Sequence, residues 1–424
     1  MTSVWIVNHY ASDPRDSATG SRHFSLARRL CQLGWEPVLI AASSEHNSSR
    51  QRLDPGSPWG TDQSDGVLFR WIRTSVYHGN GPARLVNILQ FTIAILLRRS
   101  TRDLTPPQIV IGSTVHPLAA WSASSLARRH HVPFIFEIRD LWPQTLIDMG
   151  KLRQNGIPAR LMRRLERLLC TRAAGIITLL PHAADYLATI GVDPNKVTWI
   201  SNGTDVADFQ THPSATGTVF TFQYFGSLGI ANGLPAILHG FSDALRENPR
   251  IKCRLKLTGN GPERSNLVKL AAELGLSDLI EFAPGVPKEQ IPTVAAQSDC
   301  LVVNLLDLKI YRYGISLNKL FDYMAAARPI VIAGNAVNNP VRDSDGGVCV
   351  PANDSAAIGE AMTRVLQADN AQREKWGRNA ASYVAQHFDY SVLGDKLDEV
   401  LRMHLVKAAA GHSAPVSRRD QNPQ

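Results

Sequence analysis

The stretch GISLNKLFDYMAAARP, residues 314–329, carries the argument for both fold and ligand, because it combines a helix start with a basic residue and a carboxylate. We expect Ser316 to cap the helix, which leaves the amides of residues 317–319 unpaired at the positive end of the helix dipole. Lys319 adds a positive charge, and the Asp322 carboxylate can accept hydrogen bonds from two ribose hydroxyls at once. The stretch therefore predicts a site for a nucleoside diphosphate.

The same spacing also fits an ordinary amphipathic helix. In that interpretation Leu320, Phe321 and Met324 lie in the core, and Asp322 only favours the helix dipole. Spacing alone leaves both interpretations open.

Short apolar runs alternate with helical patterns along the rest of the chain. Alternating strands and helices predict a parallel sheet covered on both faces, and two series of runs predict two such domains. Ligands of these sheets lie beyond the carboxyl ends of the strands, so a cleft between the domains is expected. The first series lies at 4–7, 37–41, 108–111, 133–138, 175–179 and 196–200, and the second at 221–225, 253–257, 279–282, 300–305, 329–332 and 348–350.

A polar segment with Gly and Pro, from Asn202 to about Thr218, predicts the hinge between the domains. The chain has 424 residues, of which 44% are hydrophobic, and this is enough to bury two cores. The predicted fold class is α/β, with two Rossmann-like, doubly wound parallel-sheet domains. We place them at 1–210 and 218–390, followed by a C-terminal helix at 391–406 and a disordered tail at 407–424.

The five cysteines are odd in number and share no spacing typical of metal ligands, so neither a disulfide framework nor a zinc site is predicted. Residues 3–7 read as a first strand and lack the order of a signal peptide. We therefore expect a cytoplasmic protein.

Positive charge is concentrated in the N-terminal half, where residues 1–210 have a net charge of +7, against +1 for the remainder. An apolar run at 85–97 ends at Arg98 and Arg99, and residues 160–172 contain five arginines among leucines. Both segments are too short to span a bilayer. Either they lie on anionic lipid at the inner face of the plasma membrane, or they are packed helices with a solvated basic face. The arginines lack interleaved aromatic residues, so nucleic acid is not an expected partner.

The stretch at 314–329 resembles the helix-start segment of family 4 glycosyltransferases, in which a Ser-Pro-Asn-Lys-Leu-Phe-Glu-Tyr-Met-Ala type of sequence binds the nucleotide sugar. These are retaining enzymes of the two-domain GT-B fold, and the resemblance extends over most of the chain. It implies that the N-terminal domain binds the acceptor and the C-terminal domain binds the nucleotide sugar. It also implies donor contacts from Gly314, Ile315, Ser316, Asn318, Lys319 and Asp322.

Gly20 stands in the loop between the first strand and a helix that begins near His23. A glycine at such a place lets the backbone approach a diphosphate closely, although a simple turn uses the same residues. The resemblance implies that Gly20 faces the donor phosphates.

Three charged residues, Glu137, Arg139 and Asp140, follow an apolar strand. Many family members end this strand in His-Asp, with the His near the reacting sugar, whereas the Arg-Asp-Leu-Trp-Pro form here resembles the bacterial N-acetylfucosamine transferases. Arginine is always protonated and cannot act as a general base. We expect Arg139 to stabilise phosphate charge, together with Lys319, while Asp140 or Glu137 positions a hydroxyl. The alternative is an ion pair of Arg139 with Asp140 or Glu137 that only orders the loop.

Other donor-site loops match the family in part. Ser227 and Asn232 stand where the family has an Arg and a Lys, so this loop can contact phosphate only through neutral groups. Gly261 lies in a loop that resembles one near the nucleotide, and Val286 in a segment whose backbone holds the base. Plain turn chemistry explains these loops equally well.

The family's pair of glutamates is also incomplete, since Asp322 replaces the second and Gly314 stands at the first. We expect the amides of Gly314 and Ile315 to substitute for the missing carboxylate. Asp343-Ser344-Asp345 spells a metal-binding signature but precedes two glycines, so a turn is predicted. We expect no metal and no cofactor, and a structural role for His116, His130, His131 and His182.

The resemblance implies a retaining transferase that moves a hexose or N-acetylhexosamine, with UDP favoured as the nucleotide. The implied acceptor is a lipid-linked oligosaccharide or another saccharide, used in bacterial surface polysaccharide synthesis. The expected mechanism is dissociative, with cations and amides stabilising the leaving diphosphate. Two other functions stay open, namely a UDP-sugar epimerase of the same build and a non-catalytic sugar-binding or scaffold protein.

Overall fold

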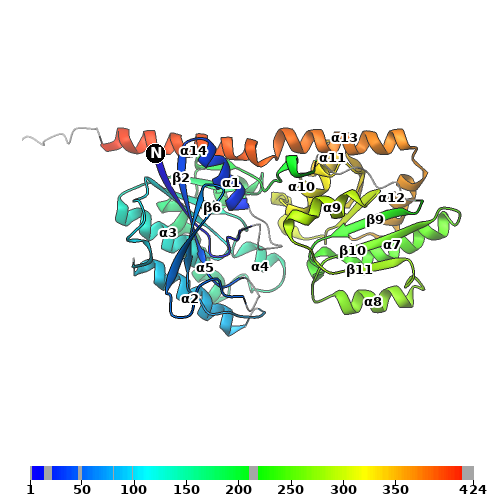
Figure 1. Cartoon of the computed structure of the whole chain (residues 1–424), viewed down its shortest axis with the longest axis horizontal. Helices are drawn as coiled ribbons and strands as arrows, with labels where there is room; N and C mark the ends of the chain where they lie inside the picture. Colours follow the sequence, from blue (N-terminus) through cyan, green and yellow to red (C-terminus); the bar gives the residue numbers. More distant parts are fainter. Residues whose placement is uncertain are drawn as a thin grey trace, which may run out of the picture.

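The structure, a computed structural model, describes residues 2–13, 22–45, 50–79, 81–97, 99–209 and 218–412. These residues form two α/β domains side by side along the long axis of the molecule (Figure 1). Gly20, the segment 210–217 of the predicted hinge and residues 413–424 of the predicted tail lie outside the described residues. Among the described residues, no helix has the length and the apolar content that a bilayer-spanning segment needs.

The N-terminal domain contains an eight-stranded sheet of order β3-β4-β2-β1-β5-β6-β7-β8, in which only the β3–β4 pair is antiparallel. The sequence did not predict the β3–β4 pair, because β3 is polar and largely exposed. The strands are β1 (Thr2–Val7), β2 (Trp35–Ala42), β3 (Trp59–Ser64), β4 (Val67–Ile72), β5 (Ile109–Ser113), β6 (Phe134–Ile138), β7 (Gly175–Thr178) and β8 (Val197–Trp199).

Helices cover both faces of this sheet, because the alternate residues of a strand point to opposite faces. Trp5 and Val7 of β1 pack with α2, α3 and α5, while Val4 and Ile6 pack with α1 and α14. The helices of this domain are α1 (Arg22–Gln32), α2 (Pro82–Leu96), α3 (Pro117–His130), α4 (Gln144–Asp148), α5 (Ile157–Arg172) and α6 (Ala183–Thr189), with 3₁₀ turns η1 (Arg99–Thr101), η2 (Pro194–Lys196) and η3 (Val206–Phe209).

The C-terminal domain contains a six-stranded, fully parallel sheet of order β11-β10-β9-β12-β13-β14. All six of the strands predicted there are present, so the prediction of two parallel-sheet α/β domains is confirmed. The strands are β9 (Phe220–Phe225), β10 (Cys253–Thr258), β11 (Ile280–Ala283), β12 (Cys300–Asn304), β13 (Ile330–Ala333) and β14 (Gly347–Val350).

One face of the second sheet packs against α7, α8 and α12, and the other against α9, α10, α11 and α13. Leu320, Phe321 and Met324 of α10 are buried in the second of these cores, as the amphipathic interpretation predicts. The helices are α7 (Leu234–Glu247), α8 (Arg264–Glu273), α9 (Ile291–Ala296), α10 (Asn318–Ala325), α11 (Pro340–Asp343), α12 (Ser355–Gln367) and α13 (Asn370–His387), with 3₁₀ turns η4 (Ile230–Asn232), η5 (Lys288–Gln290) and η6 (Lys309–Tyr313).

The last helix, α14 (Tyr390–His412), returns to the N-terminal domain and packs against α1 (Figure 1). Arg29 of α1 donates to Asp395 at 2.8 Å, and the Trp35 indole donates to Asp398 at 2.6 Å. The predicted tail was wrong for residues 407–412, because the helix continues to His412.

The chain crosses between the domains twice, and the two crossings are hydrogen-bonded to each other. The Thr204 amide donates to the Phe388 carbonyl, and the Tyr390 amide donates to the Thr204 carbonyl, both at 3.1 Å. These hydrogen bonds tie Thr204 at the first crossing to the segment that leads into α14.

Candidate functional site

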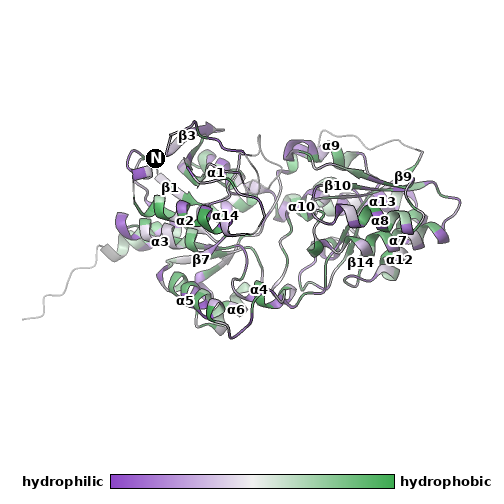
Figure 2. Cartoon of the chain, turned by 90° about the horizontal axis from the view of Figure 1, so that it is seen from below, coloured by the Kyte–Doolittle hydropathy of each residue, from purple (hydrophilic) through white to green (hydrophobic). Residues whose placement is uncertain are grey.

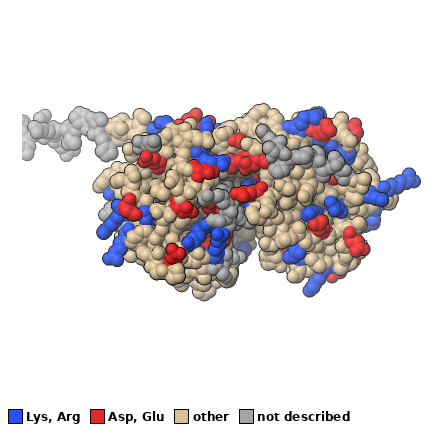
Figure 3. Space-filling view, in the orientation of Figure 1, with Lys and Arg blue, Asp and Glu red and all other residues tan. Residues whose placement is uncertain are grey.

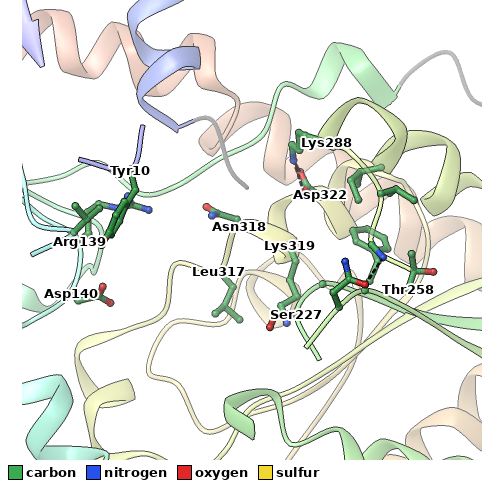
Figure 4. A pocket seen from close by; sticks show the side chains of 18 of the residues that line it. Tyr10, Arg139, Asp140, Ser227, Thr258, Lys288, Leu317, Asn318, Lys319 and Asp322 are labelled. Carbon is green, nitrogen blue, oxygen red and sulfur yellow. Dashed lines mark hydrogen bonds and ion pairs between the residues drawn. The ribbon is translucent and has the colours of Figure 1, made fainter. Parts of the chain in front are cut away.

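A cavity of about 750 Å³ lies between the two domains, at the carboxyl ends of their central strands. The N-terminal domain contributes residues that follow β1, β5 and β6, and the C-terminal domain contributes residues that follow β9, β10 and β11 and the start of α10. Figure 4 shows the two walls facing each other, with Arg139 and Asp140 opposite Lys319 and Asp322. The lining residues used below are Tyr10, Arg84, Thr114, Arg139, Asp140, Ser227, Val286, Lys288, Leu317, Asn318, Lys319 and Asp322.

Lys319 is one of two lysines that line the C-terminal wall, and its amine contacts neutral groups. Its Nζ donates to the Tyr224 hydroxyl at 2.7 Å and to Asn232 Oδ1 at 2.5 Å, and it lies 4.5 Å from the centre of the Tyr224 ring. The Tyr224 hydroxyl in turn donates to the Ser227 carbonyl. Burial lowers the pKa of Lys319 to about 7. The amine is thus only partly charged at neutral pH, and an anion in the cavity would stabilise its charged form.

Ser316 does not cap α10, contrary to the sequence prediction. The helix begins at Asn318, and the preceding Leu317 has an extended backbone and no side chain that could cap it. The Ser316 hydroxyl instead accepts a hydrogen bond from the Asn202 amide at 2.8 Å and pairs with the Ser201 hydroxyl at 2.9 Å. It therefore joins the two domains behind the cavity rather than lining it, whereas Asn318 does line the cavity.

Asp322 lines the cavity, but other protein groups already bind its carboxylate. The Thr204 hydroxyl donates to Oδ1 at 2.7 Å, and Lys288 Nζ lies 2.5 Å from Oδ1 and 2.6 Å from Oδ2. The Asp322 side chain is 7% exposed, and the Lys288 side chain is 22% exposed. Lys288 was missed by the sequence analysis, because nothing in the Val-Pro-Lys segment indicates that its side chain reaches α10.

The amides of Gly314 and Ile315 cannot replace the missing carboxylate, because both are already engaged. The Gly314 amide donates to the Tyr311 carbonyl at 3.1 Å, and the Ile315 amide donates to Asn338 Oδ1 at 2.7 Å. Gly314 has a φ of +106°, and a Cβ there would lie 2.4 Å from Pro181 Cδ of the N-terminal domain. The predicted substitution by these two amides was wrong: Gly314 packs closely against that domain, and Ile315 is bonded and packed within the C-terminal domain.

The other C-terminal residues predicted to contact a donor divide into lining and supporting residues. Ser227 and Val286 line the cavity. Asn232 stands behind it and holds Lys319. Gly261 serves the packing of two loops, because a Cβ there would lie 2.3 Å from the Leu228 carbonyl oxygen.

Glu137 is buried behind the N-terminal wall and does not reach the cavity. It accepts hydrogen bonds from Arg22 Nε at 3.0 Å and from His23 Nε2 at 2.6 Å. Burial disfavours its charge, but His23 and Arg22 hold the pKa of the carboxyl well below its usual range. Arg22 also donates to the carbonyls of Ile200 and Ser201. The prediction that Glu137 positions a substrate hydroxyl was wrong, since it anchors α1 and the start of the hinge.

Arg139 and Asp140 both line the cavity, as predicted for the end of β6. The Arg139 amide donates to the Thr114 hydroxyl at 2.9 Å, which fixes the backbone at this point. Asp140 is exposed where it lines the cavity. The surrounding protein raises the pKa of the Asp140 carboxyl, and the charge of Arg139 opposes that shift. These two residues provide a cation and a carboxylate opposite Lys319.

A pair of histidines supports the N-terminal wall. The Nδ1 of His116 accepts the Ala119 amide at 3.2 Å and caps α3, and its Nε2 lies 2.7 Å from His9 Nδ1. Burial lowers the pKa of His116 to about 3, so its ring is neutral and Nε2 carries the proton that is shared with His9. His116 thus has the structural role predicted for it. Next to this pair, Arg84 donates to the Tyr10 hydroxyl at 3.2 Å.

Tyr10 and Arg84 were not predicted, although both line the cavity. The only signal for Tyr10 was its position directly after the first strand. Arg84 lies in the first turn of an apolar helix, where a single arginine does not indicate a binding site. In the described parts of the chain, no cluster of three His, Cys, Asp or Glu could hold a metal ion. The Asp343-Ser344-Asp345 segment lies at the end of α11, where Asp345 has a left-handed turn conformation.

Two family profiles match the chain, a glycosyl transferase 4-like domain over residues 19–203 and glycosyl transferases group 1 over residues 220–368. The α-D-kanosaminyltransferase of Streptomyces kanamyceticus is 27% identical over 42% of this chain and 44% of its own length. The D-inositol 3-phosphate glycosyltransferase of Frankia alni is 26% identical over 81% of this chain and 84% of its own length.

Solved structures share the fold of both domains. Sucrose-phosphate synthase from Thermosynechococcus elongatus has a TM-score of 0.73 and 15% identity over 96% of this chain and 100% of that chain. Alr3699/HepE of Anabaena, solved in complex with UDP-glucose, has a TM-score of 0.62 and 12% identity over 95% of this chain and 100% of that chain. At these identities the similarity concerns the fold alone.

Proposed function

We propose that this chain, which belongs to the glycosyltransferases of GT-B fold, transfers a hexose or N-acetylhexosamine from a UDP-sugar to a lipid-linked saccharide with retention of configuration. The observation that carries the proposal is the inter-domain cavity, in which Lys319 and Arg139 lie on opposite walls (Figure 4). Two cations facing one space suit a diphosphate that gains charge as the sugar leaves. The acceptor half of the reaction is assigned to the N-terminal wall.

The C-terminal wall suits the donor. In this proposal Gly285 and Val286 offer backbone to the base and Asp322 contacts the ribose, which is supported by the position of all three in the lining of the cavity. Lys319 is placed to meet the diphosphate. UDP is favoured because Alr3699/HepE, which shares this fold, was solved with UDP-glucose. The diphosphate charge is met by side-chain cations, so we propose a reaction that needs neither a metal nor a cofactor.

In the proposed mechanism the bond between the sugar and the diphosphate breaks ahead of attack by the acceptor hydroxyl. The leaving diphosphate takes the acceptor proton, since Arg139 cannot act as a base. Among the described residues of the N-terminal wall, Asp140 is the carboxylate that lines the cavity, and its proposed role is to orient the acceptor hydroxyl.

The surface of α2 and α5 supports a lipid-linked acceptor. Leu85 and Ile93 on α2, and Leu97 directly after it, are 56%, 52% and 64% exposed. Along the helix axis, Leu97 lies about 20 Å from Arg84, which lines the cavity, at 1.5 Å of rise per residue. There the helix borders a second groove, of about 810 Å³, lined in part by Ile93 and Leu97. A saccharide in the cavity and a lipid along α2 would fit one molecule.

Basic residues flank these apolar side chains. Helices α2 and α5 both contact α3, so they lie on the same face of the N-terminal domain (Figure 2). On α5, Arg160 and Arg164 are exposed beside Leu161. Figure 3 shows Lys and Arg side chains on the lower part of the N-terminal half. Apolar and cationic groups on one face are suited to an anionic membrane surface at the cytoplasmic side.

A vesicle assay tests this surface. The variant Ile93→Glu is expected to bind vesicles of anionic phospholipid several-fold more weakly than the wild type. The control is Val268→Glu on α8 of the C-terminal domain, where Val268 is 45% exposed, and it should bind as the wild type does. Equal binding by the two variants would remove the membrane role from α2.

The reaction itself is tested by incubating the protein with bacterial membranes and a panel of labelled UDP- and GDP-sugars, followed by lipid extraction. Label that enters lipid from one donor, and fails to do so with Asp322→Ala, identifies the transferase and its donor together. Conversion of the nucleotide sugar without any acceptor would instead indicate an epimerase. Binding of a nucleotide sugar that always stays unchanged would indicate a non-catalytic protein.

A further inference from the structure

The Asp322 carboxylate has little free capacity for ribose. An ionised carboxylate offers about four positions for hydrogen-bond donors, two on each oxygen. Oδ1 receives Thr204 and Lys288, and Oδ2 receives Lys288 a second time. One position remains, on Oδ2. Two ribose hydroxyls therefore cannot both donate to this carboxylate while its present partners stay in place.

Lys288 can supply the second hydrogen bond to a ribose. Its ammonium group has three protons, of which two point to Asp322, so one donor remains. Lys288 lines the cavity two residues after Val286, at the start of η5 (Figure 4). The pair thus presents one acceptor and one donor side by side on the donor wall. A cis-diol fits this arrangement, because one hydroxyl can donate to Asp322 while the other accepts from Lys288.

We propose that Lys288 and Asp322 act as one ribose-recognising unit, in which Lys288 is a specificity residue for a ribonucleotide donor. The inference rests on the proposed function, since it places the donor at this wall. The ion pair stays intact on binding, because withdrawal of Lys288 would leave a nearly buried carboxylate without its counter-charge. Lys288 therefore selects the donor and does not act as a gate that must open.

The test first identifies which of UDP and GDP binds more tightly. Calorimetry then compares the affinity of that nucleotide with the affinities of its 2′-deoxy and 3′-deoxy forms. For the wild type we expect each deoxy form to bind at least about tenfold more weakly. Lys288→Met should weaken binding of the ribonucleotide by about 10- to 100-fold, and it should bring the ratio close to one for the deoxy form that lacks the hydroxyl bound by Lys288. Lys288→Arg keeps charge and donors and should retain most of the discrimination. The control is Lys256→Met, which removes an ion pair with Glu281 on β10 and β11, away from the cavity.

Ribonucleotide binding by Lys288→Met that equals or exceeds that of the wild type would overturn the inference and identify Lys288 as a gate. An unchanged ratio between ribo and deoxy forms would also overturn it. If Lys288→Met does not fold, loss of discrimination in Lys288→Gln decides in its place. Absence of nucleotide binding by the wild-type protein would overturn the proposed function as a whole, whereas the other outcomes affect only Lys288.

Discussion

Donor binding should take up protons between pH 7 and pH 9, because Lys319 has to be charged to meet a diphosphate. Burial among neutral partners lowers the pKa of its amine to about 7, so at higher pH the free protein holds it mostly uncharged. A unit charge 4 Å away at an effective dielectric of 20 contributes about 4 kcal/mol. That energy raises the pKa of the amine by about three in the complex.

The pKa of Lys319 in the free protein and its higher pKa in the complex set the direction of the pH dependence. Below pH 7 the amine is charged in both states, and affinity is constant. Above pH 7 binding requires a proton, so the affinity for a UDP-sugar falls by up to tenfold per pH unit until the pKa of the complex is reached. The number of protons taken up per molecule of donor bound should be about one half at pH 7 and close to one at pH 9.

Calorimetry in buffers of different ionisation enthalpy measures this proton count directly. A nucleotide sugar is the suitable ligand, since its diphosphate does not titrate in this range. Lys319→Arg, which stays charged throughout, should bind without proton uptake, and Lys319→Met should bind weakly and without pH dependence. Equal proton uptake by the wild type and by Lys319→Met would refute the reasoning.

Three further predictions concern the framework of the site. Glu137→Gln leaves Arg22 buried without a counter-charge and should cost about 3–5 kcal/mol in urea unfolding, whereas Glu374→Gln, in an exposed pair with Arg378, should cost under about 0.5 kcal/mol. Gly314→Ala combines a left-handed backbone with a clash against Pro181 and should lower stability by about 1–3 kcal/mol in thermal melts; an unchanged melting temperature would contradict this. Transfer activity should survive prolonged treatment with EDTA, and loss that is restored only by added divalent metal would contradict the proposed metal-free chemistry.

The sequence predicted the fold far better than it predicted the roles of individual residues. Alternation of apolar runs with helical patterns is a local signal that repeats many times, so the two parallel sheets could be inferred from it. The β3–β4 pair was not predicted, because the exposed residues of β3 are polar. Arg139, Asp140, Lys319 and Asp322 were found because they end a strand or begin a helix of such sheets.

Three of the misassigned residues share one cause. Ser316, Ile315 and Glu137 have the chemistry of a site, but each is engaged by a partner more than 20 positions away in the sequence. Lys288 and Arg84 reach the cavity from segments whose local pattern indicates only a turn or an apolar helix. Local sequence does not reveal which distant group will meet a given side chain.

The sequence by itself thus determined the two-domain α/β fold and the wall that holds Lys319 and Asp322, because hydrophobic periodicity and helix starts are properties of short segments. Only the tertiary structure decided the charge and the free hydrogen-bonding capacity of those groups. Segments remote in sequence bury Lys319, and this burial lowers the pKa of its amine. The carboxylate of Asp322 binds Thr204 and Lys288. Desolvation and hydrogen bonding depend on every neighbour in space, and those neighbours are set when the two domains come together.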